Sequence, residues 1–232
     1  MIRIRRSRER GHADHGWLNS FHTFSFADYH DPKHMSFGAL RVINEDRITP
    51  GAGFPTHPHR DMEIISYPLE GAIEHKDSMG TGSVIRPGDV QRMTAGSGVT
   101  HSEYNHSKSE GAHFFQIWIL PNKPGLTPGY EQKAFADAEK RGKWRLVASE
   151  DGREGSVVVH QDVSLHVTIL EKGEKVVYAV KRGRRVWLQI ARGAVAVGAE
   201  VLVQGDGAAI TDEEAISVEA QDAAEVLLFD LS

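Results

Sequence analysis

Two pairs of side chains in this sequence have the types and the spacing that bind a metal ion. The first pair is His57 and His59, and the second, about forty residues later, is His101 and Glu103. Successive side chains of a β-strand point to opposite faces, so the members of each pair share a face if both stretches are extended. Three imidazoles and one carboxylate form a borderline-hard ligand set that suits Fe(II), Mn, Co, Ni, Cu or Zn. Such a set leaves coordination positions open, as catalytic sites do.

A histidine pair alone is a weak signal, because the chain has 13 histidines and a solvated surface pair would look the same. The neighbouring residues strengthen it. Gly51 and Glu63 flank the first pair, and Gly98 and Asn105 flank the second. This arrangement resembles the two sequence motifs of the cupin superfamily, with two departures: a glycine falls one residue late, at Gly71, and Gly96 stands where the second motif usually has proline.

Composition excludes several other classes of function. The chain of 232 residues is long enough for one large or two small domains, and its 40% of hydrophobic residues is enough to form a core. The net charge of −5 gives no electrostatic reason to bind nucleic acid or an anionic membrane directly, and the basic stretch 3–10 is interpreted as a solvated edge strand. There is no cysteine, which excludes disulfides, thiolate metal sites and cysteine nucleophiles.

The sequence shows no targeting signal that we can identify. Its first ten residues are mostly charged, unlike a secretory signal. No segment approaches the ~18 apolar residues of a membrane span. We therefore expect a cytoplasmic protein, and we expect it to be a monomer.

The first half has the pattern of short β-strands separated by turns, with little helical periodicity. Alternation at 22–26 predicts a strand with its aromatic side chains facing inward. Strands are expected at 2–4, 22–26, 38–44, 62–69, 72–75, 83–85 and 113–120. Many short, evenly spaced strands favour a closed barrel or a double-sheet jelly roll.

Prolines and glycines between residues 121 and 130 indicate a long connection. Residues 131–142 can hold one short helix, and β character then resumes. We therefore predict an all-β fold with two domains, residues 1–130 and 131–232. Strands of the second domain are expected at 155–160, 165–170, 175–180, 185–191, 194–197, 207–210, 215–218 and 225–229.

The second half has the pattern of a diverged repeat of the first. The stretch around Gly71 is echoed around Gly193, and Asp89 is echoed by Asp206. No His-x-His or His-x-Glu pair follows residue 140, so we predict a metal site in the first half only and ordinary core or surface roles for His160 and His166. Counted from these anchors, the positions that correspond to the four candidate ligands are Ala179, Lys181, Val218 and Ala220.

The first half resembles the pirin family, a group of bicupins, and specifically its bacterial members described as quercetin 2,3-dioxygenases. The motifs that carry this resemblance are specific and cover most of residues 11–120, whereas the second half matches only in general character, at Gln189, Gly193 and the ending 227–230. The resemblance rests on residues 17–29 (WLNSFHTFSFADY), 40–46 (LRVINED), 56–63, 69–71, 75–80 and 95–103.

Membership of this family would imply two cupin barrels (double-stranded β-helix, or jelly-roll) placed face to face, with short helices in the connection. It would also imply one mononuclear metal, usually iron as Fe(II), in the N-terminal barrel and none in the C-terminal barrel. Carried over position by position, the family's metal ligands fall on His57, His59, His101 and Glu103.

The resemblance further implies a metal-dependent dioxygenase that opens the heterocyclic ring of quercetin-type flavonols with O2 and releases carbon monoxide. The 3-hydroxyl group of the flavonol would bind the metal as the enolate, because a cation stabilises the deprotonated oxygen. Glu103, as the carboxylate of the set, would accept that proton as a general base. The expected partners are accordingly a small aromatic enol or flavonol and O2.

Two other functions remain open. The chain could be an iron-binding regulatory module of the pirin type that has no physiological flavonol substrate and acts through a protein partner. It could also be a cupin isomerase or lyase that does not use O2. An anaerobic assay distinguishes this last class from the dioxygenase, because only the dioxygenase requires O2.

Several other residues are weaker candidates. Glu63 occupies a motif position that is a ligand in many cupins, and we expect it to support the ligands from outside the coordination sphere. Gly96 and Gly98 would allow a turn or a close approach of backbone to the site. The aromatic residues expected to be core rather than pocket are Phe24, Phe26, Phe54, Phe114 and Trp118, and the histidines expected to be structural or surface residues are His12, His15, His22 and His113.

Overall fold

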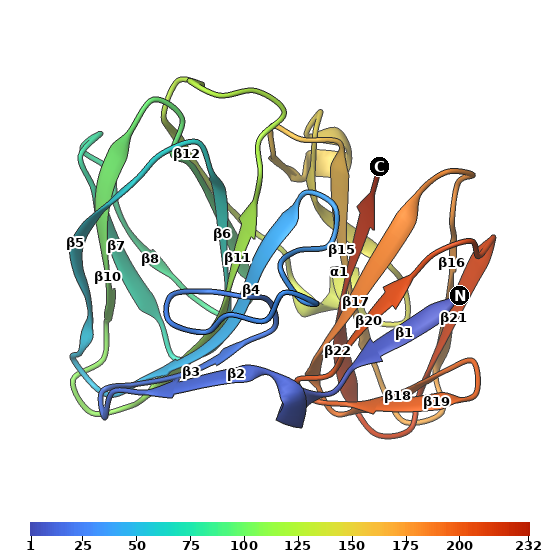
Figure 1. The fold of residues 1–232 in the computed structure, drawn as a ribbon. Coiled ribbons are helices and arrows are strands. Elements are labelled where there is room, and N and C mark those ends of the chain that lie inside the picture. The colour runs from blue at the N-terminus through green and yellow to red at the C-terminus, as the bar shows by residue number, and fades with distance from the viewer. The chain divides into compact units, whose positions relative to one another are not determined.

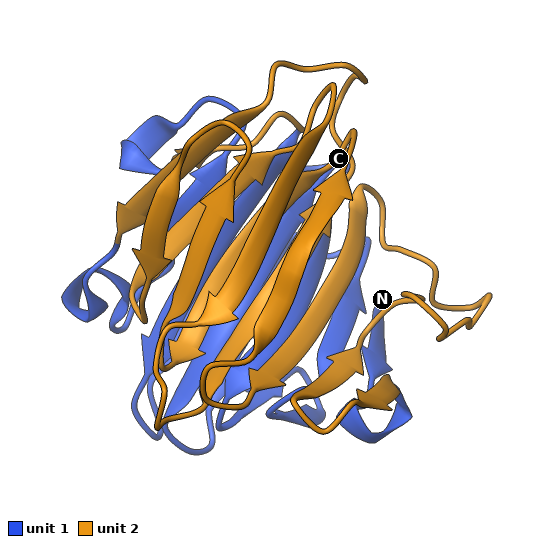
Figure 2. Cartoon of the chain, turned by 90° about the vertical axis from the view of Figure 1, so that its left-hand side faces the viewer, with its two compact units in different colours: residues 1–10, 135–156, 162–232 blue, residues 11–134, 157–161 orange.

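The computed structural model describes residues 1–232, which form two compact units (Figure 2). Apart from one turn of α-helix, α1 at Asp137–Lys140, and 3-10 turns at Ser7–Glu9 and Arg153–Gly155, the regular structure is β, which confirms the all-β prediction. No helix is long and apolar enough to cross a membrane. The N-terminal unit comprises residues 11–134 and 157–161, and the C-terminal unit comprises residues 1–10, 135–156 and 162–232.

The N-terminal unit consists of antiparallel strands in two sheets (Figure 1). The larger sheet has the strand order β12-β9-β6-β11-β4-β3-β2, and the smaller has the order β5-β10-β7-β8. The strands are β2 (Gly11–Asp14), β3 (Leu18–His22), β4 (Leu40–Ile48), β5 (Gly53–His59), β6 (Glu63–Glu70), β7 (Ile73–Asp77), β8 (Gly82–Ile85), β9 (Asp89–Thr94), β10 (Val99–Asn105), β11 (Ala112–Ile119), β12 (Gly129–Ala134) and the two-residue β14 (Val157–Val158).

Strand β10 shows how the sequence pattern produces an inward-facing site. Along it, Val99, His101, Glu103 and Asn105 are buried, whereas Tyr104 is exposed. The period of two in burial is that of a strand with one face toward the barrel interior. The same alternation therefore places both candidate ligands of this strand inside.

The C-terminal unit is likewise antiparallel, with one sheet in the order β1-β20-β17-β22-β15-β13 and another in the order β16-β21-β18-β19. Its interior is a large cluster of buried aliphatic side chains from both sheets. The strands are β1 (Ile2–Arg5), β13 (Arg145–Ser149), β15 (Val163–Leu170), β16 (Lys175–Ala179), β17 (Arg185–Arg192), β18 (Ala194–Val197), β19 (Glu200–Val203), β20 (Gly207–Ile210), β21 (Ala215–Ala220) and β22 (Ala224–Leu231).

The predicted internal repeat is visible in the backbone. Gly71 and Gly193 have φ angles of 69° and 70°, and in each case a Cβ atom would lie within 3 Å of a backbone oxygen. Both positions therefore require glycine for the same reason. The corresponding ligand positions need a correction, because β16 pairs with β21 so that Val176 is opposite Val218.

This register replaces two of the four predicted equivalents. Opposite Val218 the structure has Val176, and two residues further along β16 it has Tyr178. Ala179 and Lys181, which we obtained by counting along the sequence, lie beyond these positions. The count failed because strand lengths and bulges differ between the two halves, and a linear count does not include them.

The one short helix expected within residues 131–142 is confirmed, as α1 at Asp137–Lys140. Residues 129–134, at the start of that stretch, form β12, which pairs with β9. The predicted division into residues 1–130 and 131–232 stays a prediction. The compact units differ from it because β12 belongs with the N-terminal unit and because β1 pairs with β20 of the C-terminal unit.

The strand predicted at 22–26 is wrong in its extent. Strand β3 ends at His22, and the residues after it turn, with Ser25 N donating to His34 O and Phe26 N donating to Tyr29 O. Ala27 then has a φ of 47°, a left-handed conformation that no strand continues through. The alternation of aromatic residues in this stretch therefore reflects a folded loop.

Candidate metal centre

The two predicted ligand pairs lie on adjacent antiparallel strands. β5 pairs with β10 so that His57 is opposite His101. A β-bulge follows, because the next pair places Glu103 opposite Phe54 and gives β5 one extra residue over this interval. One ring nitrogen from each of His57, His59 and His101 lies within 4.8 Å of the other two. The structure thus brings the three predicted histidines together.

Hydrogen bonds define which nitrogen of each ring faces the cluster. His57 Nδ1 lies 2.8 Å from Pro55 O, which can only accept, so Nδ1 carries the proton and Nε2 presents a lone pair. His75 Nε2 lies 3.0 Å from a carboxylate oxygen of Asp77, which makes Nε2 the donor and His75 Nδ1 an acceptor. His101 Nδ1, at 3.4 Å from His75 Nδ1, is then the donor, and His101 Nε2 is left unprotonated.

This pattern of protons fits a bound cation. His57 Nε2 and His101 Nε2 are 3.0 Å apart, and two lone pairs at that distance repel each other unless a positive charge lies beside both. Two nitrogens bound at ~2.1 Å to one metal ion, at right angles, are ~3.0 Å apart. In addition, His59 Nε2 is buried and has no hydrogen-bond partner. The donor set and its orientation therefore fit a divalent metal ion.

Electrostatics keep His59 and His101 in the neutral form that metals bind. Burial, followed by the neighbouring rings of His101 and His57, lowers the pKa of His59 to about 4. Burial and the rings of His57 and His75 lower the pKa of His101 to about 3. Both rings are thus neutral at pH 7, each with one N–H group and one nitrogen lone pair.

The aspartate behind His75 is ionised. Although burial raises its pKa, hydrogen bonds from His75 and from the backbone N–H groups of Thr81 and Met79 bring the pKa of Asp77 below its usual value. The side chains of His75 and Asp77 are both fully buried. The chain His101–His75–Asp77 has the form of the outer-shell hydrogen bonds that orient metal-bound histidines.

Glu103 is held at the edge of the cluster by two neutral donors. Gln116 Nε2 donates to Glu103 Oε2 at 2.6 Å, and Ser66 Oγ donates to Glu103 Oε1 at 3.2 Å. Glu103 Oε2 is 4.0 Å from His101 Nε2, and the side chain is 1% exposed. The carboxylate is therefore fixed beside the histidines while both oxygens retain lone pairs.

A second set of potential ligands, formed by His75, His101 and Glu103, also has its ligand atoms within 4.8 Å of one another. It shares His101 and Glu103 with the predicted set. His75 already bonds to Asp77 through Nε2 and to His101 through Nδ1. We therefore assign His75 to the support of the ligands.

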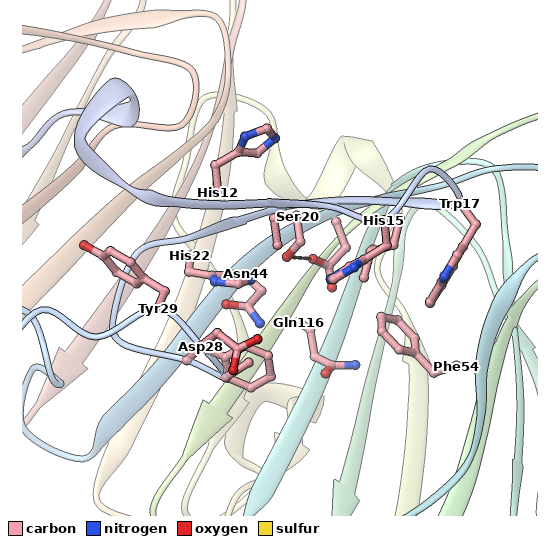
Figure 3. Close-up of a pocket in the computed structure, with 15 residues that line it drawn as sticks. His12, His15, Trp17, Ser20, His22, Asp28, Tyr29, Asn44, Phe54 and Gln116 are labelled. Atoms are coloured by element: carbon pink, nitrogen blue, oxygen red, sulfur yellow. Dashed lines mark hydrogen bonds between the residues drawn. The ribbon is translucent and has the colours of Figure 1, made fainter.

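A cavity of about 610 Å³ lies within the N-terminal unit next to Gln116 (Figure 3). Figure 3 shows Trp17 and Phe54 at one side of it and His22 and Tyr29 at the other. Gln116 bonds Glu103, so one lining residue of the cavity contacts a candidate ligand, although none of the four candidate ligands lines the cavity itself. The remaining lining residues are His12, Ala13, His15, Leu18, Ser20, Phe26, Ala27, Asp28, Asn44 and Asp46.

Asp46 is an unusual group in this cavity. It accepts a hydrogen bond of 2.5 Å from Ser20 Oγ, and it is 2% exposed. Burial, opposed by the Ser20 hydrogen bond and reinforced by the charges of Glu103 and Glu45, raises the pKa of Asp46 to about 7. A carboxyl group that titrates near neutrality in a cavity is a candidate functional group.

Glu63 does not have the role that we predicted. Along β6, Ser66 faces the cluster, and Glu63, three residues earlier, faces the opposite side of the sheet. Glu63 Oε2 instead accepts hydrogen bonds from the backbone N–H and from Nδ1 of His160, both at 3.1 Å. Glu63 therefore anchors the segment 157–161 to the N-terminal unit.

The other weaker candidates divide between core and cavity. Phe24 and Phe114 are buried core residues, as expected, whereas Phe26 and Phe54 line the cavity. Trp118 packs edge-on against His59 at 5.0 Å between ring centroids. None of the four other histidines joins the ligand cluster: His113 bonds Glu45, and the three that line the cavity are His12, His15 and His22.

Gly96 supports a close backbone approach rather than the metal site. Its φ is 46°, and a Cβ atom would lie 1.9 Å from the carbonyl oxygen of Leu126. Gly98 has a φ of 137° and no close neighbour of this kind. Both residues shape the turn that leads into β10.

Sequence reasoning missed the residues that support the ligands. His75 ends the strand predicted at 72–75, and Asp77 follows it by two residues, so extending that strand, as β7 (Ile73–Asp77) does, would have placed both on one face. Gln116 interrupts an otherwise apolar run at 114–120. Neither signal indicates its partner, because the contacts of His75 with His101 and of Gln116 with Glu103 cross between strands.

Profiles of known families match both halves of the chain. The family described as "Pirin" matches residues 2–119, and the family described as "Quercetinase C-terminal cupin domain" matches residues 146–231. A protein of Escherichia coli K12 named quercetin 2,3-dioxygenase is 53% identical over 231 residues, which cover 100% of this chain and 99% of that protein. A pirin-like protein of Caulobacter vibrioides is 43% identical over 95% of each chain.

Solved structures agree with these matches. The crystal structure of YhhW from Escherichia coli has a TM-score of 0.96 and 51% identity, covering 100% of this chain and 98% of that one. A structure of the bacterial pirin YhhW in complex with nickel(II) has a TM-score of 0.95 and 52% identity, covering 100% and 99%. These matches confirm the predicted two-cupin fold.

Proposed function

Because this chain belongs to the pirin family, we propose that it is a metal-dependent dioxygenase that opens the heterocyclic ring of quercetin-type flavonols. The reaction takes up one O2 and releases one ring carbon as carbon monoxide. The name of the similar Escherichia coli protein supports the choice of substrate. The observation that carries the proposal is the cluster of inward-facing imidazole lone pairs beside a carboxylate whose hydrogen-bond donor, Gln116, lines a cavity.

We assign the metal ligands as His57, His59, His101 and Glu103. The metal is proposed to be Fe(II), and this ligand set also accepts Mn, Co, Ni, Cu or Zn. When bound, the ion would stabilise the deprotonated 3-hydroxyl oxygen of the flavonol and make O2 chemistry accessible. The similarity to a nickel(II) complex supports a divalent metal at this site.

Glu103 is the proposed general base. Its two oxygens already accept hydrogen bonds from Gln116 and Ser66, so the carboxylate keeps its orientation when it takes the proton of the 3-hydroxyl group. Burial of the side chain excludes water that would compete for that proton. Gln116 lines the cavity as well, which supports a binding pose in which the flavonol presents its 3-hydroxyl group toward Glu103.

The test combines elemental analysis with a quercetin assay in air and under nitrogen. We expect stoichiometric metal and consumption of quercetin only in air. Glu103→Gln should lower kcat by about 100-fold or more, the range of a lost general base, with a smaller loss of metal. Equal losses of metal and kcat would reduce Glu103 to a ligand. Consumption under nitrogen would indicate an isomerase or lyase, and a metal-loaded protein without turnover would indicate a regulatory module.

A further inference from the structure

The proposed function leaves one wall of the cavity without a role. Strand β4 lies beside β11, with Asn44 directly opposite Gln116. Asp46 is two residues further along β4, so it faces the same side at a distance of roughly 7 Å along the strand. Ser20 on β3 is opposite Asp46 and bonds it. This wall therefore begins next to the residue that holds Glu103 and extends away from it.

Asn44 and Asp46 both have unused hydrogen-bonding capacity. Each is 2% exposed, and Asn44 Oδ1 is buried without a partner. Asp46 accepts from Ser20 through Oδ1, which leaves Oδ2 as a second acceptor. Burying a polar atom without a partner is unfavourable, so Asn44 Oδ1, with the unused acceptor of Asp46 on the same cavity wall, indicates a polar ligand. Because both offer acceptors, the ligand must offer donors.

The other walls define the rest of that ligand. Trp17, Phe26 and Phe54 present ring faces and edges to the cavity, and Trp17 and Phe54 pack edge to face at 5.2 Å. Aromatic walls of this kind suit a flat aromatic ligand. Phenolic hydroxyl groups are the donors that such a ligand carries.

We propose that Asn44 and Asp46 form a subsite that selects ligands with a further phenolic hydroxyl group besides the one that faces Glu103. The subsite rests on the proposed function, since it assumes that the 3-hydroxyl end of the ligand faces Glu103. It defines the ligand class as planar polyphenols with at least one hydroxyl group in addition to the metal-directed one. A flavonol with a single hydroxyl group, at position 3, would occupy the cavity but leave both acceptors unpaired.

The experiment compares quercetin with 3-hydroxyflavone, which has only the metal-directed hydroxyl group. Binding to the metal-loaded protein is measured under nitrogen at pH 8, by quenching of tryptophan fluorescence, so that turnover is not required. Wild type should bind quercetin at least tenfold more tightly than 3-hydroxyflavone. Asp46→Asn and Asn44→Ala should each weaken quercetin binding about tenfold and change 3-hydroxyflavone binding less than twofold.

Two variants guard against trivial effects. Asp46→Asn keeps the shape of the side chain, so it should fold, and Ser164→Ala in the C-terminal unit is a control that should change neither affinity. Equal weakening of both ligands by Asp46→Asn and Asn44→Ala, or no change in either, would overturn the subsite. If quercetin binds in an Asp46-dependent manner and is not consumed in air, the subsite stands and the proposed dioxygenase function fails.

Discussion

The two barrels have corresponding rows of inward-facing residues with opposite chemistry. In the N-terminal unit the row that crosses β3, β4, β11, β6 and β9 consists of His22, Asn44, Gln116, Ser66 and Gln91. In the C-terminal unit the row that crosses β13, β15, β22, β17 and β20 consists of Leu146, His166, Leu228, Leu188 and Ala208. The rows correspond because Ser66 and Leu188 each precede the repeated glycine, Gly71 or Gly193, by five residues.

The two rows differ in what they contribute to the stability of their barrels. A fully buried leucine contributes about 1.5–3 kcal/mol to stability, so the C-terminal row maximises burial. A buried polar group without a partner costs about 1–3 kcal/mol. Gln116 and Ser66 avoid this cost by bonding Glu103, whereas Asn44 Oδ1 and Gln91 Oε1 are buried without a partner. The N-terminal barrel therefore gives up stability to retain a polar interior.

The strand positions of the ligands differ in the same way. Where the N-terminal barrel has His57, His59, His101 and Glu103, the C-terminal barrel has Val176, Tyr178, Val218 and Ala220. Val218 and Ala220 are part of the aliphatic core. The predicted absence of histidine and carboxylate from these positions therefore holds in the corrected register.

One polar cluster of the C-terminal barrel bonds internally, although His166 Nδ1, in the same barrel, is buried without a partner. Tyr178 Oη donates to Asp230 at 2.6 Å, and Arg184 bonds both Asp230 and Asp162. Asp230 thus has a partner on each oxygen. Whereas the N-terminal cluster presents unpaired lone pairs, this cluster closes on itself, which is the arrangement of a structural network.

The largest difference between the barrels is expected when one imidazole is removed from each. His101→Ala should abolish stoichiometric metal binding and quercetin turnover, because it deletes a ligand and the link to His75. His166→Ala should leave both unchanged. Metal content by elemental analysis, with circular dichroism to confirm the β fold, measures the effect. Unchanged metal content in His101→Ala would refute the assignment.

A smaller effect is expected from the residues behind the ligand. His75→Ala and Asp77→Asn should each lower metal affinity about 10- to 100-fold, since they release the ring of His101 from its fixed orientation. Competition with a chelator gives the affinity. A matched control is His113→Ala, which removes another buried histidine–carboxylate pair of the same unit. A loss as large in the control would mean that general destabilisation is responsible.

The polar row can be tested through the pH dependence of stability. Asp46 has a pKa of about 7 in the folded protein against an ordinary value of 3.8. Between these values the folded state binds more protons than the unfolded state, so Asp46 lowers stability as the pH rises from 4 to 7. Asp46→Asn removes this penalty and should raise the free energy of unfolding by about 2 kcal/mol more at pH 8 than at pH 5.

Urea denaturation of the metal-free protein at both pH values measures that difference. Wild type and Asp46→Asn share every other titrating group, so their difference isolates this carboxyl group. An equal effect of the substitution at the two pH values would show that Asp46 is ionised throughout this range.

The smallest effect is expected in the C-terminal network. Tyr178→Phe removes one hydrogen bond to the carboxylate of Asp230 and should lower the free energy of unfolding by about 2 kcal/mol. Metal content and quercetin turnover should not change. A loss of turnover without a loss of stability would mean that this barrel takes part in function.

The amino-acid pattern alone fixes which residues share a face on the two ligand strands. The period of two along a strand is local, so His57 and His59, and likewise His101 and Glu103, share a face in any extended conformation. The absence of His-x-His and His-x-Glu pairs from the second half could also be read directly from the sequence. The all-β class could be read from the spacing of short strands and turns.

The protonation and orientation of those side chains depend on contacts that form only in the folded protein. The proton on His101 is set by His75 and Asp77, and the position of Glu103 is set by Gln116 and Ser66. These contacts cross between strands, and their register depends on bulges such as the one in β5. A linear pattern does not encode register, which is why counting gave Ala179 and Lys181 where pairing gives Val176 and Tyr178.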